Sequence, residues 1–330
     1  MRDMVNLVMA EADLGLLELG SSSAKFHRLV GDGIGGRTVE TSKVRWRISY
    51  RVYQEGDDGS GCIDEIISSI VALGATLDDT DLARVFCVAT GVFRDMSAMD
   101  EVQDEVMAAT GVRVRLLSGA DEARLMALGL RRLGVDPPVL ACDLGGSSME
   151  WAYRAEDGAT KCGSLALGAI RSTVAWPKAE EDGEAFLREG RAACQALMDE
   201  LVGLEPKSCL LSGGTARTAA AIAGAVTGDT LVGSIPRVVT RDDLHALLSE
   251  VVAKGPPPMV KEGRREIFAA GLLILDTMMA VSGATQFVQR TEAVRDGLVV
   301  RLLRLLEERQ VQELETRELM DTDSIAGETT

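Results

Sequence analysis

Two short segments of the sequence place an acidic residue, glycine and serine in the same order. They are Glu18-Leu19-Gly20-Ser21-Ser22-Ser23 and Asp143-Leu144-Gly145-Gly146-Ser147-Ser148, and each lies between two apolar stretches. Glycine allows backbone N–H groups to point inward at close range, and the serine hydroxyls add donors, so both segments could bind phosphate oxygens. The acids Glu18 and Asp143 could hold Mg²⁺, directly or through water, and the metal would bridge to the phosphates.

A third glycine segment, Ser212-Gly213-Gly214-Thr215, is expected where a strand meets a helix, so that the helix dipole would favour an anion. One glycine turn alone is usually structural, because turns need glycine. Three such turns after strands, two of them with a matching acid, favour a phosphate site. The predicted phosphate-binding residues are Gly20, Ser21, Ser22, Ser23, Gly145, Gly146, Ser147, Ser148, Gly213, Gly214 and Thr215.

The elements that carry these turns alternate between short apolar strands and segments of helical period, which predicts an α/β fold. We expect strands at 14–20, 24–30, 44–53, 84–90, 112–117, 139–143, 149–153, 208–212 and 286–289, and helices at 63–77, 98–109, 120–133, 180–204 and 215–225.

A chain of 330 residues is expected to form two lobes of similar size. A Gly/Pro connector separates a predicted N-terminal lobe, residues 1–135, from a C-terminal lobe, residues 136–310. The acidic segment 311–330 is expected to be a flexible tail.

The composition excludes several kinds of chemistry and partner. A formal net charge of -16 argues against nucleic acid or an anionic membrane as a partner. The two histidines, His27 and His245, lie far apart, which argues against a His-rich metal site. The six cysteines are scattered singly and are predicted to be reduced core residues. No stretch has the length of a signal peptide core or a membrane span, so we expect a cytoplasmic protein.

Seven segments resemble, in the same order, motifs of the exopolyphosphatase and guanosine pentaphosphate phosphatase (Ppx/GppA) family. They are residues 18–23, 89–94, 117–125, 143–150, 164–171, 213–217 and 294–297, and the third, Leu-Ser-Gly-Ala-Asp-Glu-Ala-Arg-Leu, is the most distinctive. The resemblance extends from residue 14 to residue 303. It implies the actin-like ATPase (ASKHA) superfold, which has two RNase H-like lobes and an interlobe cleft.

The resemblance also implies the roles of five side chains. Glu122 is the general base that activates water, Arg94 clamps the phosphate, and Glu18, Asp143 and Glu150 are the acids associated with Mg²⁺. Attack of water on a phosphoryl group needs such a base and such cations. Considered alone, Glu122 could equally be a helix-capping acid, and Arg94 a surface ion-pair residue.

These features predict a Mg²⁺-dependent phosphohydrolase. Its substrate would carry a terminal phosphoanhydride, as polyphosphate, a guanosine pentaphosphate-like nucleotide or a related phosphorylated metabolite does. An actin-fold kinase or ATP-using transferase is the alternative enzyme. A non-catalytic phosphate or nucleotide sensor is also open, because Glu18, Ser22, Ser147 and Met149 depart from the family motifs. A homodimer is left open as the assembly.

Overall fold

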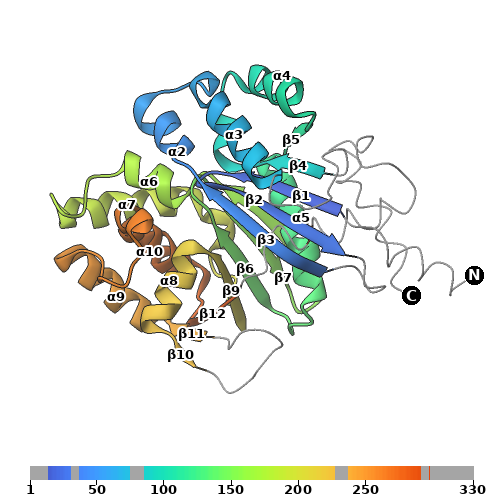
Figure 1. Cartoon of the computed structure of the whole chain (residues 1–330). Helices are drawn as coiled ribbons and strands as arrows, with labels where there is room; N and C mark the ends of the chain where they lie inside the picture. The colour runs from blue at the N-terminus through green and yellow to red at the C-terminus, as the bar shows by residue number, and fades with distance from the viewer. Residues whose placement is uncertain (1–13, 31–36, 75–84, 227–236, 291–296, 298–330) are drawn as a thin grey trace, which may run out of the picture. The chain divides into compact units, whose positions relative to one another are not determined.

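The computed structural model describes residues 14–30, 37–74, 85–226, 237–290 and 297 (Figure 1). These residues form two compact units, each with its own sheet. The chain leaves the first unit inside helix α5 (Gly119–Arg132), after Leu125, and Gly297 groups with that first unit. The lobe limits at residues 135 and 310 stay predictions. The predicted tail 311–330 and residues 294–296 of the last motif lie outside the described residues.

The described part of the first unit contains a five-stranded sheet of order β3-β2-β1-β4-β5. Strands β1 (Leu14–Gly20), β2 (Ser23–Val30) and β3 (Arg37–Arg45) pair antiparallel. Strands β4 (Val85–Ala89) and β5 (Val114–Leu116) run parallel to β1. The predicted hairpin of the first Gly/Ser segment is therefore present as β1 and β2.

Alternation along the strands sends one set of apolar side chains into the core of the first unit. Leu17, Leu19 and Phe26 pack there with residues of α3 (Ile63–Gly74) and α4 (Met99–Thr110). Each fully buried side chain of this size contributes about 1.5–3 kcal/mol to stability. Gly15 leaves room for the ring of Phe26, because a Cβ atom at Gly15 would lie 2.7 Å from Phe26 Cε2.

The predicted strand at 44–53 is wrong beyond Arg45. The chain turns there into the short helix α2 (Ile48–Tyr50) and a π-helical turn at Arg51–Glu55. Ile48 and Ser49 are adjacent and both fully buried, whereas a strand with one solvated face would expose one of them. A helical turn buries both, and it brings the Ser49 hydroxyl to the carbonyl of Ser21.

The described part of the second unit contains a seven-stranded sheet of order β10-β11-β12-β9-β6-β7-β8. Strands β6 (Val139–Leu144), β7 (Met149–Arg154) and β8 (Thr160–Leu165) form an antiparallel meander. Strand β9 (Ser208–Gly213) pairs parallel with β6 and with β12 (Gln286–Gln289). The edge is completed by β10 (Ala225–Val226) and β11 (Arg237–Thr240).

Helices pack on this sheet around a core that contains Trp151, Phe268 and Phe287, all fully buried. They are α6 (Ala169–Ala175), α7 (Gly183–Leu197), α8 (Gly214–Ala223), α9 (Arg241–Lys254) and α10 (Glu262–Ser282). The helix predicted at 180–204 is longer than the observed α7. The helix begins at Gly183 because the Asp182 side chain caps it by accepting a hydrogen bond from Ala185 N. None of the described helices combines the length and the apolar content that a membrane crossing requires.

A buried acid links three helices of the second unit. Asp276, in the middle of α10, accepts a hydrogen bond of 3.2 Å from His245 Nδ1 of α9. Its Oδ2 lies 3.6 Å from a guanidinium nitrogen of Arg191 in α7. The Asp276 side chain is only 5% exposed, so these two partners offset the cost of burying its charge.

The six cysteines form no disulfide, and all except the half-buried Cys162 are buried. Loss of hydration on burial raises the pKa of the Cys62 thiol to about 11 and that of Cys194 to about 12. The prediction of unpaired core cysteines is confirmed for the five buried residues.

Candidate active site

The first Gly/Ser segment forms a tight turn between β1 and β2. Gly20 pairs with Ser23 across the hairpin, so Ser21 and Ser22 are the two residues of the turn. The hydroxyl of Ser21 accepts a hydrogen bond from Val92 N, at 3.4 Å, in the 3₁₀ turn Gly91–Asp95. This contact joins the turn to the segment that carries Arg94.

The start of helix α5 is held by Ser118 and Asp121. The Ser118 hydroxyl accepts from Asp121 N at 3.1 Å, and Asp121 Oδ2 accepts from Ser118 N at 3.2 Å. This reciprocal pair satisfies two backbone donors at the helix start, as a capping box does. Asp121 is therefore the acid that caps the helix. Glu122 does not have this capping role.

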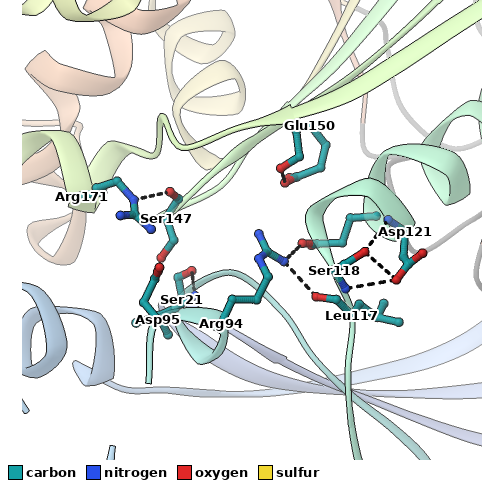
Figure 2. A network of polar contacts seen from close by, with 12 residues as sticks. Ser21, Arg94, Asp95, Leu117, Ser118, Asp121, Ser147, Glu150 and Arg171 are labelled. Atoms are coloured by element: carbon teal, nitrogen blue, oxygen red, sulfur yellow. Dashed lines mark hydrogen bonds and ion pairs between the residues drawn. The ribbon is translucent and has the colours of Figure 1, made fainter. Parts of the chain in front are cut away.

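Glu122 instead pairs with Arg94. A terminal guanidinium nitrogen of Arg94 donates to Glu122 Oε2 and, at 3.2 Å, to the carbonyl of Leu117. Figure 2 shows Arg94 reaching the start of α5 beside Leu117, Ser118 and Asp121. The Glu122 side chain is 7% exposed and that of Arg94 is 21% exposed, so the pair is largely shielded from water. The structure thus brings together the two residues predicted to be catalytic.

Glu18 lies in β1 and is held by two basic residues of β2. Its Oε2 accepts a 2.9 Å hydrogen bond from His27 Nε2 and lies 3.6 Å from Lys25 Nζ. His27 is fully buried, and its Nδ1 lies 2.9 Å from Thr41 Oγ1 of β3. One oxygen of Glu18 is therefore already engaged by protein side chains.

In the second unit, four polar residues form a row across the sheet. Asp143 of β6 stands opposite Glu150 of β7, Glu150 opposite Ser164 of β8, and Asp143 opposite Ser212 of β9. Ser164 donates its hydroxyl to Glu150 Oε1 at 2.9 Å, and Glu150 is only 4% exposed. The second Gly/Ser segment, Gly145–Ser148, connects β6 and β7 directly after this row.

The third glycine segment lies where β9 enters α8, as predicted. Gly213 has a φ of +93°, and a Cβ atom there would overlap the Leu144 carbonyl oxygen, so only glycine fits. Gly214 begins α8, and a Cβ atom there would overlap the guanidinium of Arg264. Thr215 is buried in the first turn of the helix.

The contacts of the three carboxylates decide which of them suit Mg²⁺. Two carboxylates directly opposite each other on a sheet repel, so the Asp143 and Glu150 pair favours a cation between them. Carboxylate oxygens are the donors that Mg²⁺ prefers, and one or two of them are usual. This pair fits the metal, whereas Glu18 fits it less well because of His27 and Lys25. Across the described part of the chain, no group of three or more His, Cys, Asp or Glu residues is suited to hold a metal ion.

A sequence profile of the Ppx/GppA phosphatase family matches residues 32–306. The chain belongs to this family. The Ppx/GppA assignment confirms the resemblance found in the sequence motifs, and the prediction of a phosphatase with it.

Two curated relatives of this Ppx/GppA protein carry names that state an activity. Exopolyphosphatase 1 of Mycobacterium tuberculosis is 27% identical to it over 311 residues, which cover 88% of each chain. Guanosine-5'-triphosphate,3'-diphosphate pyrophosphatase of Aeromonas hydrophila is 24% identical over 299 residues, which cover 87% of this chain and 58% of the Aeromonas protein.

Solved structures of the family show the same fold. An exopolyphosphatase from Cytophaga hutchinsonii has a TM-score of 0.76 and 15% identity, covering 89% of this chain and 98% of that one. The Aquifex aeolicus member of the Ppx/GppA family has a TM-score of 0.71 and 19% identity, covering 90% and 99%. These likenesses confirm the predicted α/β fold with two actin-type lobes.

Sequence reasoning missed the residues that support the predicted site. Ser164 and Arg171 lie in a motif that resembles the family, but neither was assigned a role. Trp46 and Ser49 fall in the part of the predicted strand 44–53 that lies beyond the end of β3 at Arg45. The sequence gives His27 no role beyond the argument against a His-rich metal site. The signal that could have found it is local, because His27 lies on the same face of β2 as Lys25.

Proposed function

We propose that this Ppx/GppA protein hydrolyses the terminal phosphoanhydride bond of polyphosphate or of a guanosine pentaphosphate-like nucleotide and releases orthophosphate. The family and the names of the Mycobacterium and Aeromonas relatives support this reaction class. The observation that supports particular residues as the catalytic groups is the ion pair of Arg94 and Glu122. This pair is largely shielded from water and lies next to the helix cap made by Asp121.

Glu122 would act as the general base. Its carboxylate takes a proton from water while the water oxygen attacks the terminal phosphorus. The anhydride P–O bond breaks, the bridging oxygen leaves with the shortened substrate, and the proton passes from Glu122 to solvent. Because Asp121 caps the helix, Glu122 is not needed for that role.

Arg94 would have two tasks in this reaction. Its bond to Glu122 fixes the direction of the carboxylate, and its positive charge stabilises the negative charge that collects on the equatorial phosphate oxygens. The bond to the Leu117 carbonyl holds the guanidinium in place when substrate competes for it. The backbone N–H groups of the Gly/Ser turns would bind further phosphate oxygens.

Asp143 and Glu150 would hold Mg²⁺, and Ser164 orients Glu150 through its hydroxyl. When bound, the metal would neutralise charge on the phosphate oxygens. Glu18 is the third predicted acid, and its contacts with His27 and Lys25 make it the weaker ligand. The homodimer and the exclusion of nucleic acid stay predictions.

A phosphate-release screen tests the function. The substrates are polyphosphates of graded length, guanosine penta- and tetraphosphates and nucleoside triphosphates, each with and without Mg²⁺. We expect Mg²⁺-dependent release of orthophosphate from at least one polyphosphate or guanosine nucleotide. Tight binding of these compounds without any turnover would contradict hydrolysis and favour the sensor. Transfer of phosphate from ATP to an organic acceptor would favour the kinase.

A further inference from the structure

The backbone carbonyls of the first Gly/Ser turn are held by one neighbouring segment, residues 46–49. Three successive carbonyls of the turn accept hydrogen bonds from residues 46–49. Trp46 Nε1 donates to Gly20 O at 2.9 Å, and Trp46 N donates to Ser22 O at 3.3 Å. The carbonyl between them, that of Ser21, accepts from the hydroxyl of Ser49.

The second Gly/Ser turn is held in the same way by the start of α6. Ala169 N donates to Gly145 O at 3.0 Å, and Ile170 N donates to Gly146 O at 2.8 Å. Arg171 Nε donates to the carbonyl of Ser147 at 2.9 Å, which Figure 2 shows. Again three successive carbonyls of the turn face one segment.

Gly168 makes this close approach possible. A Cβ atom at Gly168 would overlap Gly146 O and the backbone of Ser147. Any larger residue would therefore push the start of α6 away from the turn.

The direction of the carbonyls fixes the direction of the amides. In a planar trans peptide, the C=O of one residue and the N–H of the next point to opposite sides. If the carbonyls of residues 20–22 and 145–147 face the supporting segments, the N–H groups of residues 21, 22 and 146–148 face the other way, while Ser23 closes the hairpin opposite Gly20. Several N–H groups that point in a common direction form a concave site for an anion.

We propose that Trp46, Ser49 and Arg171 are positioning residues, which hold the two Gly/Ser turns in the conformation that binds phosphate. This inference rests on the proposed function, and it adds residues outside the turns to that site. In the first unit the side-chain donors are an indole and a hydroxyl, and in the second unit the side-chain donor is a guanidinium. Different chemical groups therefore hold the carbonyls of the two turns. Donors that are fixed before the ligand arrives bind it more tightly, because binding then costs no conformational entropy for ordering the turn.

Substitutions that remove one donor each test this inference. Trp46→Phe keeps an aromatic ring beside Phe93, whose centroid lies 6.0 Å from that of Trp46, but loses the indole N–H. Ser49→Ala and Arg171→Met lose the hydroxyl and the guanidinium. The readout is the dissociation constant of methylenediphosphonate, a diphosphate analogue that cannot be hydrolysed, measured by calorimetry with Mg²⁺.

Two control variants lose the same kinds of bond elsewhere. Thr110→Ala removes a hydroxyl bond to Val106 O within α4. Arg265→Met removes guanidinium bonds to the carbonyls of Pro256 and Pro257. We expect the positioning variants to raise the dissociation constant about tenfold, the equivalent of one hydrogen bond, while the controls change it less than about twofold. Arg171→Lys keeps a donor near Ser147 and should restore part of the affinity.

Binding by the variants and phosphate release by the wild type test different statements, because the positioning role rests on the proposed function. If Ser49→Ala and Arg171→Met bind the analogue as tightly as their controls, and the wild type still releases phosphate, the inference is wrong and the function stands. If the wild type neither binds the analogue nor releases phosphate, the proposed function fails and the inference fails with it. Should Trp46→Phe not fold, Ser49→Ala decides the outcome for the first turn.

Discussion

Replacing Glu122 with glutamine removes the proposed base while leaving its surroundings in place. Glutamine has almost the same size, and its amide oxygen can still accept the hydrogen bond from Arg94. The start of α5 is unaffected, because Asp121 makes the cap. A general base contributes about 10²–10⁴-fold to the rate. We therefore expect kcat to fall by that factor, which corresponds to about 2.7–5.4 kcal/mol in the barrier.

The same substitution should have a small effect on folding. Arg94 is 21% exposed and keeps its bond of 3.2 Å to the Leu117 carbonyl, so the guanidinium retains water and one protein acceptor. Loss of a hydrogen bond to a charged group costs about 1.5–3 kcal/mol, and the retained amide oxygen keeps the loss near the lower end. The resulting fall in Tm is a few degrees, at roughly 2–4 °C per kcal/mol. Such a protein is folded at the temperature of the assay.

Phosphate release is measured at saturating substrate, and binding of methylenediphosphonate is measured beside it. We expect binding of the Glu122→Gln variant to stay within about threefold of the wild type, because the phosphate contacts reside in the turns and in Arg94. Asp121→Asn is the matched control, because it alters the cap of the same helix and is expected to keep turnover. If Glu122→Gln retains more than about a tenth of the wild-type turnover, Glu122 is not the base. Loss of turnover in Asp121→Asn alone would assign that role to Asp121.

Further outcomes are expected from other parts of the chain. Arg94→Ala should lower kcat and raise KM together, because its charge would meet the phosphate in both the ground state and the transition state; a change in KM alone would contradict a role in the transition state. Asp276→Ala should destabilise the protein by about 1.5–3 kcal/mol in urea unfolding, because it removes the hydrogen bond from His245 to a buried carboxylate, while His245 and Arg191 stay partly hydrated; unchanged stability would show that these contacts contribute nothing. The Cys62 thiol, whose pKa is raised to about 11 by burial, has about a hundredfold less thiolate at pH 8 than an ordinary thiol, so a thiol reagent should label Cys62 slowly in the native protein and fast in the unfolded protein, as read by mass spectrometry of the labelled peptide. Short or nucleotide-linked phosphates should be better substrates than long polyphosphate, because a chain of net charge -16 attracts a long polyanion poorly, and processive degradation of long chains would contradict this.

The sequence predicts the hairpins well because their signals are local. Leu17 and Leu19 alternate with the polar Glu18, and glycine and serine mark the turn that follows. The strand predicted at 44–53 fails for the opposite reason. Ile48 is buried in the core of the first unit, and the Ser49 hydroxyl donates to the carbonyl of Ser21, which lies 28 residues earlier in the sequence. Periodicity carries no information about such a partner.

In the candidate site, too, local contacts can be predicted from the sequence and long-range contacts cannot. Ser118 and Asp121 form a capping box within four residues of sequence, so the sequence alone could have assigned the cap to Asp121. The family resemblance gave Arg94 and Glu122 their separate roles but not their ion pair, because 28 residues separate the two. Arg171 supports a carbonyl 24 residues away, and no spacing in the sequence indicates that contact. Long-range contacts are the part of the site that only the folded chain reveals.

The cap at the start of α5 has a consequence for the evolution of this family member. One residue of an α-helix corresponds to a rotation of about 100° about the helix axis. If one residue were inserted between Asp121 and Glu122, the carboxylate would turn away from Arg94 by that angle, although every residue type would survive. Most surface loops tolerate changes of length. The stretch from Ser118 to Glu122 should instead keep its length across orthologues, while substitutions that preserve the cap and the base are accepted.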